Sequence, residues 1–176
     1  FHLEPALKAA AAGKHVMVEK PLEINIERSK EMIAACKKHN VKLSCIFQNR
    51  YSDDFLKLKK RVQSGDLGKL VLANAYIKWF REQAYYDTSD WKGKLSADGG
   101  AALINQGIHT IDLLLDVMGD VKSVRGKVAT ISRKIEGEDI GVAILEFENG
   151  VLGTIEGSTS ILAGFPEKIE IHGDQG

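Results

Sequence analysis

The sequence predicts an α/β protein: the last portion of a doubly wound parallel sheet, followed by an α+β domain with a large, open and mostly antiparallel sheet. Two observations predict this class. Over residues 1–47, helix-like and strand-like segments alternate with short connections, which is typical of a parallel sheet covered by helices. Beyond residue 120 the chain is almost entirely strand-like. We therefore expect two domains, residues 1–47 and residues 48–176.

The elements of the first domain follow from local composition. Residues 3–12 are rich in helix formers, and Gly13 follows as a C-cap. The short apolar run 16–18 suits a buried parallel strand. A helix is expected over residues 25–40, because asparagine stands at both ends, first as N-cap and then as the terminating residue. Residues 41–47 then return to strand.

The second domain is predicted to hold two helices and five strands. The Asn149-Gly150 pair between two strand-like runs carries the hairpin signal, so neighbouring strands are expected to run antiparallel, with the helices on one face. A long loop, rich in aromatic and polar residues, separates the first strand from the second helix. The predicted helices are 53–62 and 101–118, and the predicted strands are 69–80, 121–133, 140–147, 151–158 and 168–172.

Composition narrows the class of partner. Lys and Arg number 24 and equal Asp and Glu, so no net charge draws the chain to nucleic acid or to an acidic membrane. No apolar run approaches the roughly 20 residues of a membrane helix. Cys36 and Cys45 form neither a metal spacing nor a disulfide framework, and we interpret them as buried thiols in a reducing cytosol. A small-molecule partner, a cytoplasmic location and no metal are expected.

The two ends of the sequence fall at places where a fold is not expected to begin or end. The chain starts at Phe1 without a methionine, inside a helix-like segment. It stops at the turn-like residues 173–176, directly after a strand-like run. We therefore expect residues to be missing at both ends.

Lys20 stands where the first strand-like run ends. Pro21 disfavours helical geometry at the residue before it, so Lys20 should be extended. Open α/β sheets bind ligands at the carboxyl ends of their strands. A lysine at this place is therefore expected to face a ligand, against the alternative of a solvated loop lysine.

His109 is the candidate base, on a helix that follows Gly99 and Gly100. A cation that holds a hydroxyl, together with a base that takes its proton, is the pair that oxidation of a secondary alcohol requires. Asp112, three residues on, is expected to accept a hydrogen bond from the imidazole, unless it only solvates the helix. Exposed amides near Gly100 are expected to favour an anion, unless this is an ordinary junction of loop and helix.

Two further groups of polar residues are candidates for binding. Gln48 and Arg50 follow the second strand and offer donors at the same sheet edge as Lys20. The long loop carries Arg81, a fork for carboxylate or phosphate, beside aromatic stacking surfaces. The alternative is that these aromatic residues only anchor the loop. They are Tyr85, Tyr86 and Trp91.

Three motifs in this order, Gly13 to Pro21, Gln48 to Tyr51 and Gly99 to His109, resemble the family of glucose-fructose oxidoreductase and inositol dehydrogenase, called Gfo/Idh/MocA. The resemblance covers nearly the whole chain. It implies a Rossmann-type domain for NAD or NADP, followed by a domain whose open sheet pairs subunits into a homodimer or homotetramer. The implied activity is hydride transfer between the cofactor and a hydroxyl of a sugar, nucleotide sugar or cyclitol.

The resemblance also implies roles for individual residues. The lysine of the Glu-Lys-Pro motif falls on Lys20, and the helical histidine falls on His109, as the catalytic pair. This chain departs from the family at Asn105, where members often carry aspartate, and at Ala101, which replaces a third glycine. The expected cofactor-binding residues are Glu19, Lys20, Pro21, Gln48 and Arg50. The expected substrate-binding residues are Arg81, Tyr85, Asn105, Gln106 and His109.

The sequence contains no Gly-x-Gly-x-x-Gly after a strand, which is the main cradle of a dinucleotide. These 176 residues alone are therefore expected to bind nucleotide poorly and to turn over nothing. Two alternatives stay open: an NAD-dependent glycoside hydrolase of the same family, and a non-catalytic module for sugar binding or oligomerisation. The presence of both Lys20 and His109 argues against the second, since a scaffold needs neither.

Overall fold

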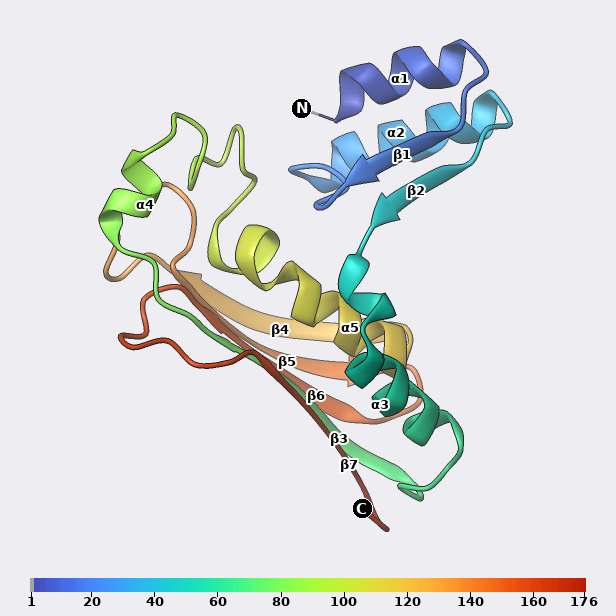
Figure 1. Ribbon diagram of the computed structural model, residues 1–176, viewed down its shortest axis with the longest axis vertical. Coiled ribbons are helices and arrows are strands. Elements are labelled where there is room, and N and C mark those ends of the chain that lie inside the picture. Colours follow the sequence, from blue (N-terminus) through green and yellow to red (C-terminus); the bar gives the residue numbers. More distant parts are fainter. Residues whose placement is uncertain (1) are drawn as a thin grey trace.

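The computed structural model describes residues 2–176, which form two parts (Figure 1). In the first part, two strands pair in parallel, with Glu19 opposite Ile46 at their carboxyl ends. Both helices of this part bury one side against the strands. The predicted parallel sheet with covering helices is therefore confirmed. The elements are α1 (Leu3–Ala11), β1 (Val16–Glu19), α2 (Ile26–Lys38) and β2 (Leu43–Ile46).

The ends of these helices are set by the residues that the sequence singled out. Gly13, just after α1, has a φ of +69°, which glycine adopts without strain. The side-chain oxygen of Asn25 accepts a hydrogen bond from the Arg28 amide at 2.9 Å and caps α2. Beyond the last turn of α2, Asn40 has a φ of +51°. Of the two thiols, Cys36 is buried and Cys45 only half-buried.

The second part is a five-stranded sheet in the order β4-β5-β6-β3-β7. Neighbouring strands are antiparallel except for β3 and β6, which pair in parallel. The mostly antiparallel sheet is thus confirmed, and so is the hairpin at Asn149 and Gly150, which joins β5 to β6. The strands are β3 (Leu70–Lys78), β4 (Val121–Ala129), β5 (Ile140–Phe147), β6 (Leu152–Ser158) and β7 (Lys168–Gly173).

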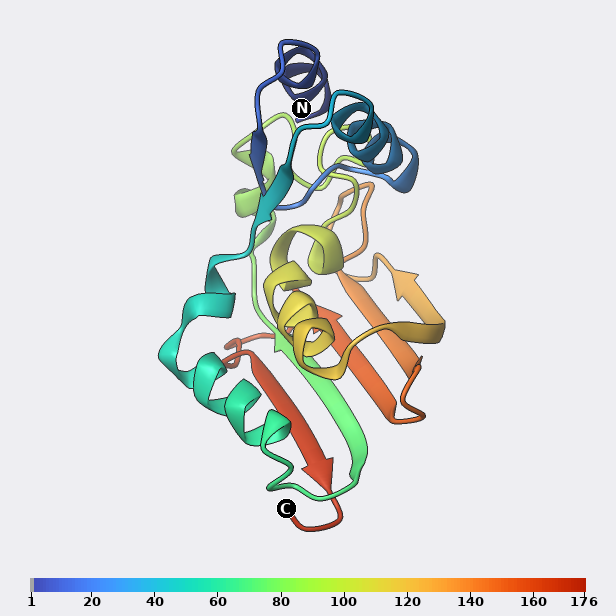
Figure 2. The ribbon, with the colours of Figure 1, turned by 90° about the vertical axis from the view of Figure 1, so that its right-hand side faces the viewer.

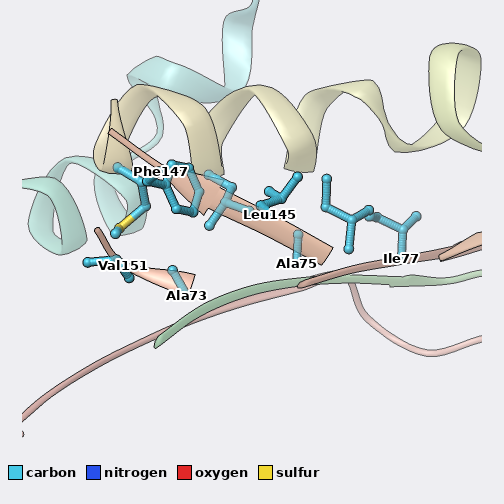
Figure 3. Close-up of a cluster of buried hydrophobic side chains, with 9 residues drawn as sticks. Ala73, Ala75, Ile77, Leu145, Phe147 and Val151 are labelled. Atoms are coloured by element: carbon cyan, nitrogen blue, oxygen red, sulfur yellow. The ribbon is translucent and has the colours of Figure 1, made fainter. Parts of the chain in front are cut away.

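Within residues 2–176, helices cover only one face of this sheet. A single 3₁₀ turn, η1 (Gln48–Tyr51), leads from β2 into α3 (Asp53–Gln63). Figures 1 and 2 show α3 lying beside α5 (Ile108–Met118) on the same face, while no helix of the part that the structure describes lies on the other. Beneath α5 the core is apolar and closely packed (Figure 3). Its members are Ala73, Ala75, Ile77, Leu114, Met118, Leu145, Phe147, Val151 and Ile155.

Two predicted elements differ from the structure. The helix expected over 101–118 is divided into a π-helix, η2 (Ala102–Gly107), and α5; in η2 the Gln106 amide bonds the Ala101 carbonyl, five residues back, at 3.2 Å. The strand expected over 121–133 ends at residue 129. The reason is Asp139, whose carboxylate accepts three successive amides, those of residues 131–133, and turns the chain there.

The expected long loop contains one short helix, α4 (Gln83–Asp87). None of the helices within residues 2–176 is both long and apolar enough to cross a membrane.

Candidate active site

Lys20 lies at the carboxyl end of β1, as expected, and its ammonium reaches the second part of the molecule. The Nζ atom donates to the backbone oxygen of Asn105 at 2.8 Å and lies 3.4 Å from the side-chain Oδ1 of the same residue. The peptide bond between Lys20 and Pro21 is cis. The end of the first sheet and the helical run η2 to α5 therefore meet at Lys20.

The side chain of Asn105 also contacts the carboxylate of Asp98, a residue that the sequence analysis did not identify. Its Nδ2 donates to Oδ1 of Asp98 at 2.6 Å, and the Gly93 amide donates to Oδ2 of Asp98 at 2.8 Å. Only 5 % of Asp98 is exposed, and burial raises the pKa of its carboxyl. One weak signal in the sequence points to Asp98: it is an acid directly before Gly99 and Gly100.

His109 stands in the first turn of α5 and is half-buried. Its ring meets the edge of the Phe47 ring, with 6.1 Å between centroids. The Nδ1 atom is buried and has no hydrogen-bond partner among the described residues. Burial lowers the pKa of His109 and the Lys20 ammonium lowers it further, while Glu167 and Asp112 act in the opposite direction. These effects together favour a neutral imidazole, which is the form that can accept a proton.

The prediction that Asp112 accepts from the His109 ring is wrong. Asp112 is engaged by Arg50, whose Nε donates to Oδ2 at 2.7 Å. The same guanidinium reaches Asp116 at 2.9 Å, and Lys59 of α3 reaches Asp116 at 2.6 Å. Arg50 thus fixes η1 against α5. Gln48, at the start of η1, stays exposed beside the carboxyl end of β2.

The expected anion site near Gly100 is occupied by the protein itself. The Glu138 carboxylate accepts from the Leu103 amide at 2.8 Å and from the Ala101 amide at 3.2 Å. A Cβ on Gly100 would lie 2.9 Å from this carboxylate. The prediction of free amides for an external anion is therefore wrong, because an internal one holds the start of η2.

Three of the expected substrate-binding residues form one cluster. Arg81 donates from Nε to Oε1 of Gln106 at 3.2 Å, and Gln106 donates from Nε2 to the Tyr85 hydroxyl at 2.9 Å. The Arg81 guanidinium lies 5.3 Å from the ring centroids of both Trp79 and Tyr85. Tyr86 is different: it is buried and bonds Thr159 at 2.8 Å, so it anchors the loop.

A pocket of about 290 Å³ opens beside Lys20. It is bounded by both polar and apolar residues, which come from both parts of the molecule. The lining residues are His2, Lys20, Pro21, Glu23, Ile24, Trp91, Ala97, Asp98 and Asn105. Within residues 2–176, no group of three or more His, Cys, Asp or Glu side chains could hold a metal ion.

Two family models match the chain. The model of the oxidoreductase family with an NAD-binding Rossmann fold matches residues 1–47. The model of the GFO/IDH/MocA C-terminal domain matches residues 55–176.

Individual relatives agree with these matches. One similar structure is the crystal structure of the WlbA dehydrogenase from Bordetella pertussis in complex with NADH and UDP-GlcNAcA. Its sequence is 36% identical to this chain, and the two structures superpose with a TM-score of 0.94. The match covers 98% of this chain and 53% of that one. Myo-inositol 2-dehydrogenase of Thermotoga maritima is 29% identical over 99% of this chain and 52% of its own length. D-glucoside 3-dehydrogenase of Escherichia coli is 31% identical over 89% of this chain and 45% of its own length.

The chain spans about half the length of the curated relatives it matches. The C-terminal family model alone accounts for well over half of the 176 residues. With the fold and the meeting of Lys20 with the η2–α5 run, this places the chain in the GFO/IDH/MocA family of oxidoreductases.

Proposed function

We propose that the whole protein is an NAD(P)-dependent oxidoreductase that transfers a hydride between the nicotinamide and a hydroxyl-bearing carbon of a sugar, nucleotide sugar or cyclitol. One observation carries this proposal. The Lys20 ammonium, at the carboxyl end of β1, contacts Asn105 of the helical run that four residues later presents His109. We infer from this contact that the cation and the imidazole act at one site.

The residues at this sheet edge suit a nicotinamide nucleotide. Open α/β sheets bind such ligands at the carboxyl ends of their strands, where β1 and β2 end here side by side. The pocket beside Lys20 combines apolar walls from Pro21 and Ile24 with polar groups. We propose that Glu19, Lys20, Pro21 and Gln48 contact the cofactor, which when bound accepts or returns the hydride. Arg50 acts at one remove, by holding η1 on α5.

The protein's own residues would handle the hydroxyl and its proton. Lys20 donates a hydrogen bond to the substrate oxygen and stabilises negative charge that develops there. The His109 imidazole takes the hydroxyl proton during oxidation and returns it during reduction. We propose that Asn105 bonds a neighbouring hydroxyl.

We propose an acidic nucleotide sugar as the substrate. The Arg81 guanidinium, with Gln106 on one side and two aromatic faces near it, can pair with a carboxylate or phosphate, and Tyr85 offers a surface for a ring. The WlbA relative, 36% identical, was crystallised with UDP-GlcNAcA. Both observations favour an anionic, nucleotide-linked sugar over a neutral cyclitol.

The test uses protein expressed from the complete gene. Candidate substrates are UDP-linked uronic acids, the free uronic acids and inositols, each with NAD and with NADP, and formation of reduced nicotinamide is recorded. His109→Ala is expected to lower kcat about 100-fold to 10,000-fold, the usual contribution of a general base. His172→Ala, a change at an exposed histidine on β7, is the control and should leave kcat unchanged. Unchanged turnover in His109→Ala would exclude this residue as the base.

Three wider assignments belong to the same proposal. We place the domain division at residues 47/48, where β2 passes into η1. The uncovered face of the five-stranded sheet is proposed to pair subunits into a homodimer or homotetramer. A cytoplasmic location is favoured by Cys36 and Cys45, which are both free thiols.

A further inference from the structure

Asp98 is placed so that both of its carboxylate oxygens are engaged by donors. One oxygen accepts from the Gly93 amide at 2.8 Å, and the other accepts from the Asn105 side chain at 2.6 Å. Only 5 % of the surface of Asp98 is exposed. A buried carboxylate is costly unless its oxygens are bonded, so this pairing holds the segment before η2 in one arrangement.

The bonds to Asn105 determine how its amide is turned. A carboxylate only accepts hydrogen bonds, and an ammonium only donates them. The Asn105 side chain lies between the two, with Nδ2 toward Asp98 and Oδ1 toward Lys20. The opposite flip would set a carbonyl oxygen against the carboxylate and an NH₂ group against the ammonium. Asp98 and Lys20 therefore impose the same orientation from opposite sides.

We propose that Asp98 is a positioning residue for Lys20: through Asn105 it directs an amide oxygen toward the ammonium and fixes where the ammonium stands. The inference rests on the proposed function, since its consequence for catalysis requires Lys20 to hold the substrate hydroxyl. Asp98 itself touches neither substrate nor cofactor in this scheme. Its effect reaches the reaction only through Lys20.

Charge acts in the same direction as geometry. Lys20 is faced by Glu19 on β1, by Asp98, and by the imidazole of His109 on α5. Burial lowers the pKa of Lys20, and Asp98, followed by Glu19, opposes this. Asp98 in turn faces Glu138 as well as Lys20. Loss of the Asp98 charge should therefore favour the neutral amine at Lys20.

The alternative is that Asp98 only caps the Gly93 amide. Asp98→Asn separates the two roles, because the new side-chain oxygen can still accept that bond. Its NH₂ group would then face Asn105, whose oxygen must turn toward position 98. Asn105 would present its own NH₂ group to the Lys20 ammonium, so that two donors oppose each other.

The experiment is an exchange of the two side chains in protein expressed from the complete gene. D98N, N105D and the double variant D98N/N105D are compared, with D90N as a control at an exposed acid of the same loop. The pKa of Lys20 is read from NMR of ¹³C-labelled lysine, assigned with Lys20→Arg, and kcat and KM are measured in parallel.

We expect D98N to lower the pKa of Lys20 and to lower kcat about 10-fold to 100-fold, the range for one lost hydrogen bond to a charged group. The double variant should recover most of both, because Asp at 105 can accept from Asn at 98 and from Lys20. D90N should change neither quantity. If D98N alone does not fold, adding D98N to N105D must still improve kcat, since N105D by itself sets two carboxylates side by side.

Other outcomes overturn the inference. An unchanged Lys20 pKa and kcat in D98N would show that Asp98 positions nothing. A loss in D98N that the double variant does not recover would show that Asp98 does not act through Asn105. Full kcat in Lys20→Met would instead contradict the proposed function, while the Lys20 titration would still report on Asp98.

Discussion

At the scale of single residues, the environment of His109 predicts the pH dependence of the reaction. A general base works only when it is unprotonated, and burial together with Lys20 lowers the pKa of His109. The imidazole should therefore stay neutral to a lower pH than an ordinary histidine, whose pKa is about 6.5, and kcat/KM should hold to a correspondingly lower pH. The acid limb of kcat/KM against pH is expected below that value. A limb well above it would mean that a different group titrates.

The single-residue predictions succeeded where the signal is local. Lys20 is placed by its neighbours, a strand before it and a proline after it, and it lies at the expected sheet end. The hydrogen-bond partners of the site residues could not be predicted in this way. Asp112 is three residues from His109 in sequence, yet it pairs with Arg50, 62 residues away. Asp98 was missed for the same reason, since its role depends on the Asn105 side chain, which contacts both Asp98 and Lys20.

At the scale of elements, the link between η1 and α5 predicts a stability effect. Arg50→Met removes the guanidinium that joins Asp112 and Asp116, and leaves the nearly buried Asp112 carboxylate without it. The Arg50 side chain is itself 41 % exposed, which weakens the pair by solvent screening. We expect the free energy of unfolding in urea to fall by about 1 to 3 kcal/mol.

The matched control is Lys57→Met, which breaks the Lys57–Asp54 pair on the exposed surface of α3. Both side chains there are largely in water, so little or no change in stability is expected. Equal losses in the two variants would show that Arg50 does no more than a surface lysine. Loss of cofactor affinity in Arg50→Met without loss of stability would instead support direct contact with the cofactor.

Element types were predictable, but some boundaries were not. The helix caps at Gly13 and Asn25 were predictable from the sequence, because each depends on residues within one helical turn. The end of β4 depends on the Asp139 carboxylate, which binds amides six to eight residues earlier. The widened turn of η2 has no local signature, and its first amides are held by Glu138, more than 30 residues away.

At the scale of the whole molecule, the uncovered sheet face predicts an effect on assembly. Val142, Ile144 and Leu152 on neighbouring strands β5 and β6 are 48 %, 61 % and 53 % exposed, a clustering that favours an interface. Ile144→Lys should therefore shift protein expressed from the complete gene toward monomer in light scattering after size exclusion. Ile131→Lys, at an exposed residue outside the strands, is the control. An unchanged mass in Ile144→Lys would move the interface elsewhere.

The parallel pairing of β3 with β6 has a consequence for how the chain assembles on the ribosome. β3 is an interior strand of the five-stranded sheet, but both of its partners, β6 and β7, are synthesised last. Until residue 158 has emerged, β3 has two open edges, and only the β4–β5 hairpin can close early. Domains usually fold from the N-terminus during synthesis, whereas this sheet must wait for its C-terminal strands. Closure across such long stretches of chain is slow, so both edges of β3 stay unpaired during that interval.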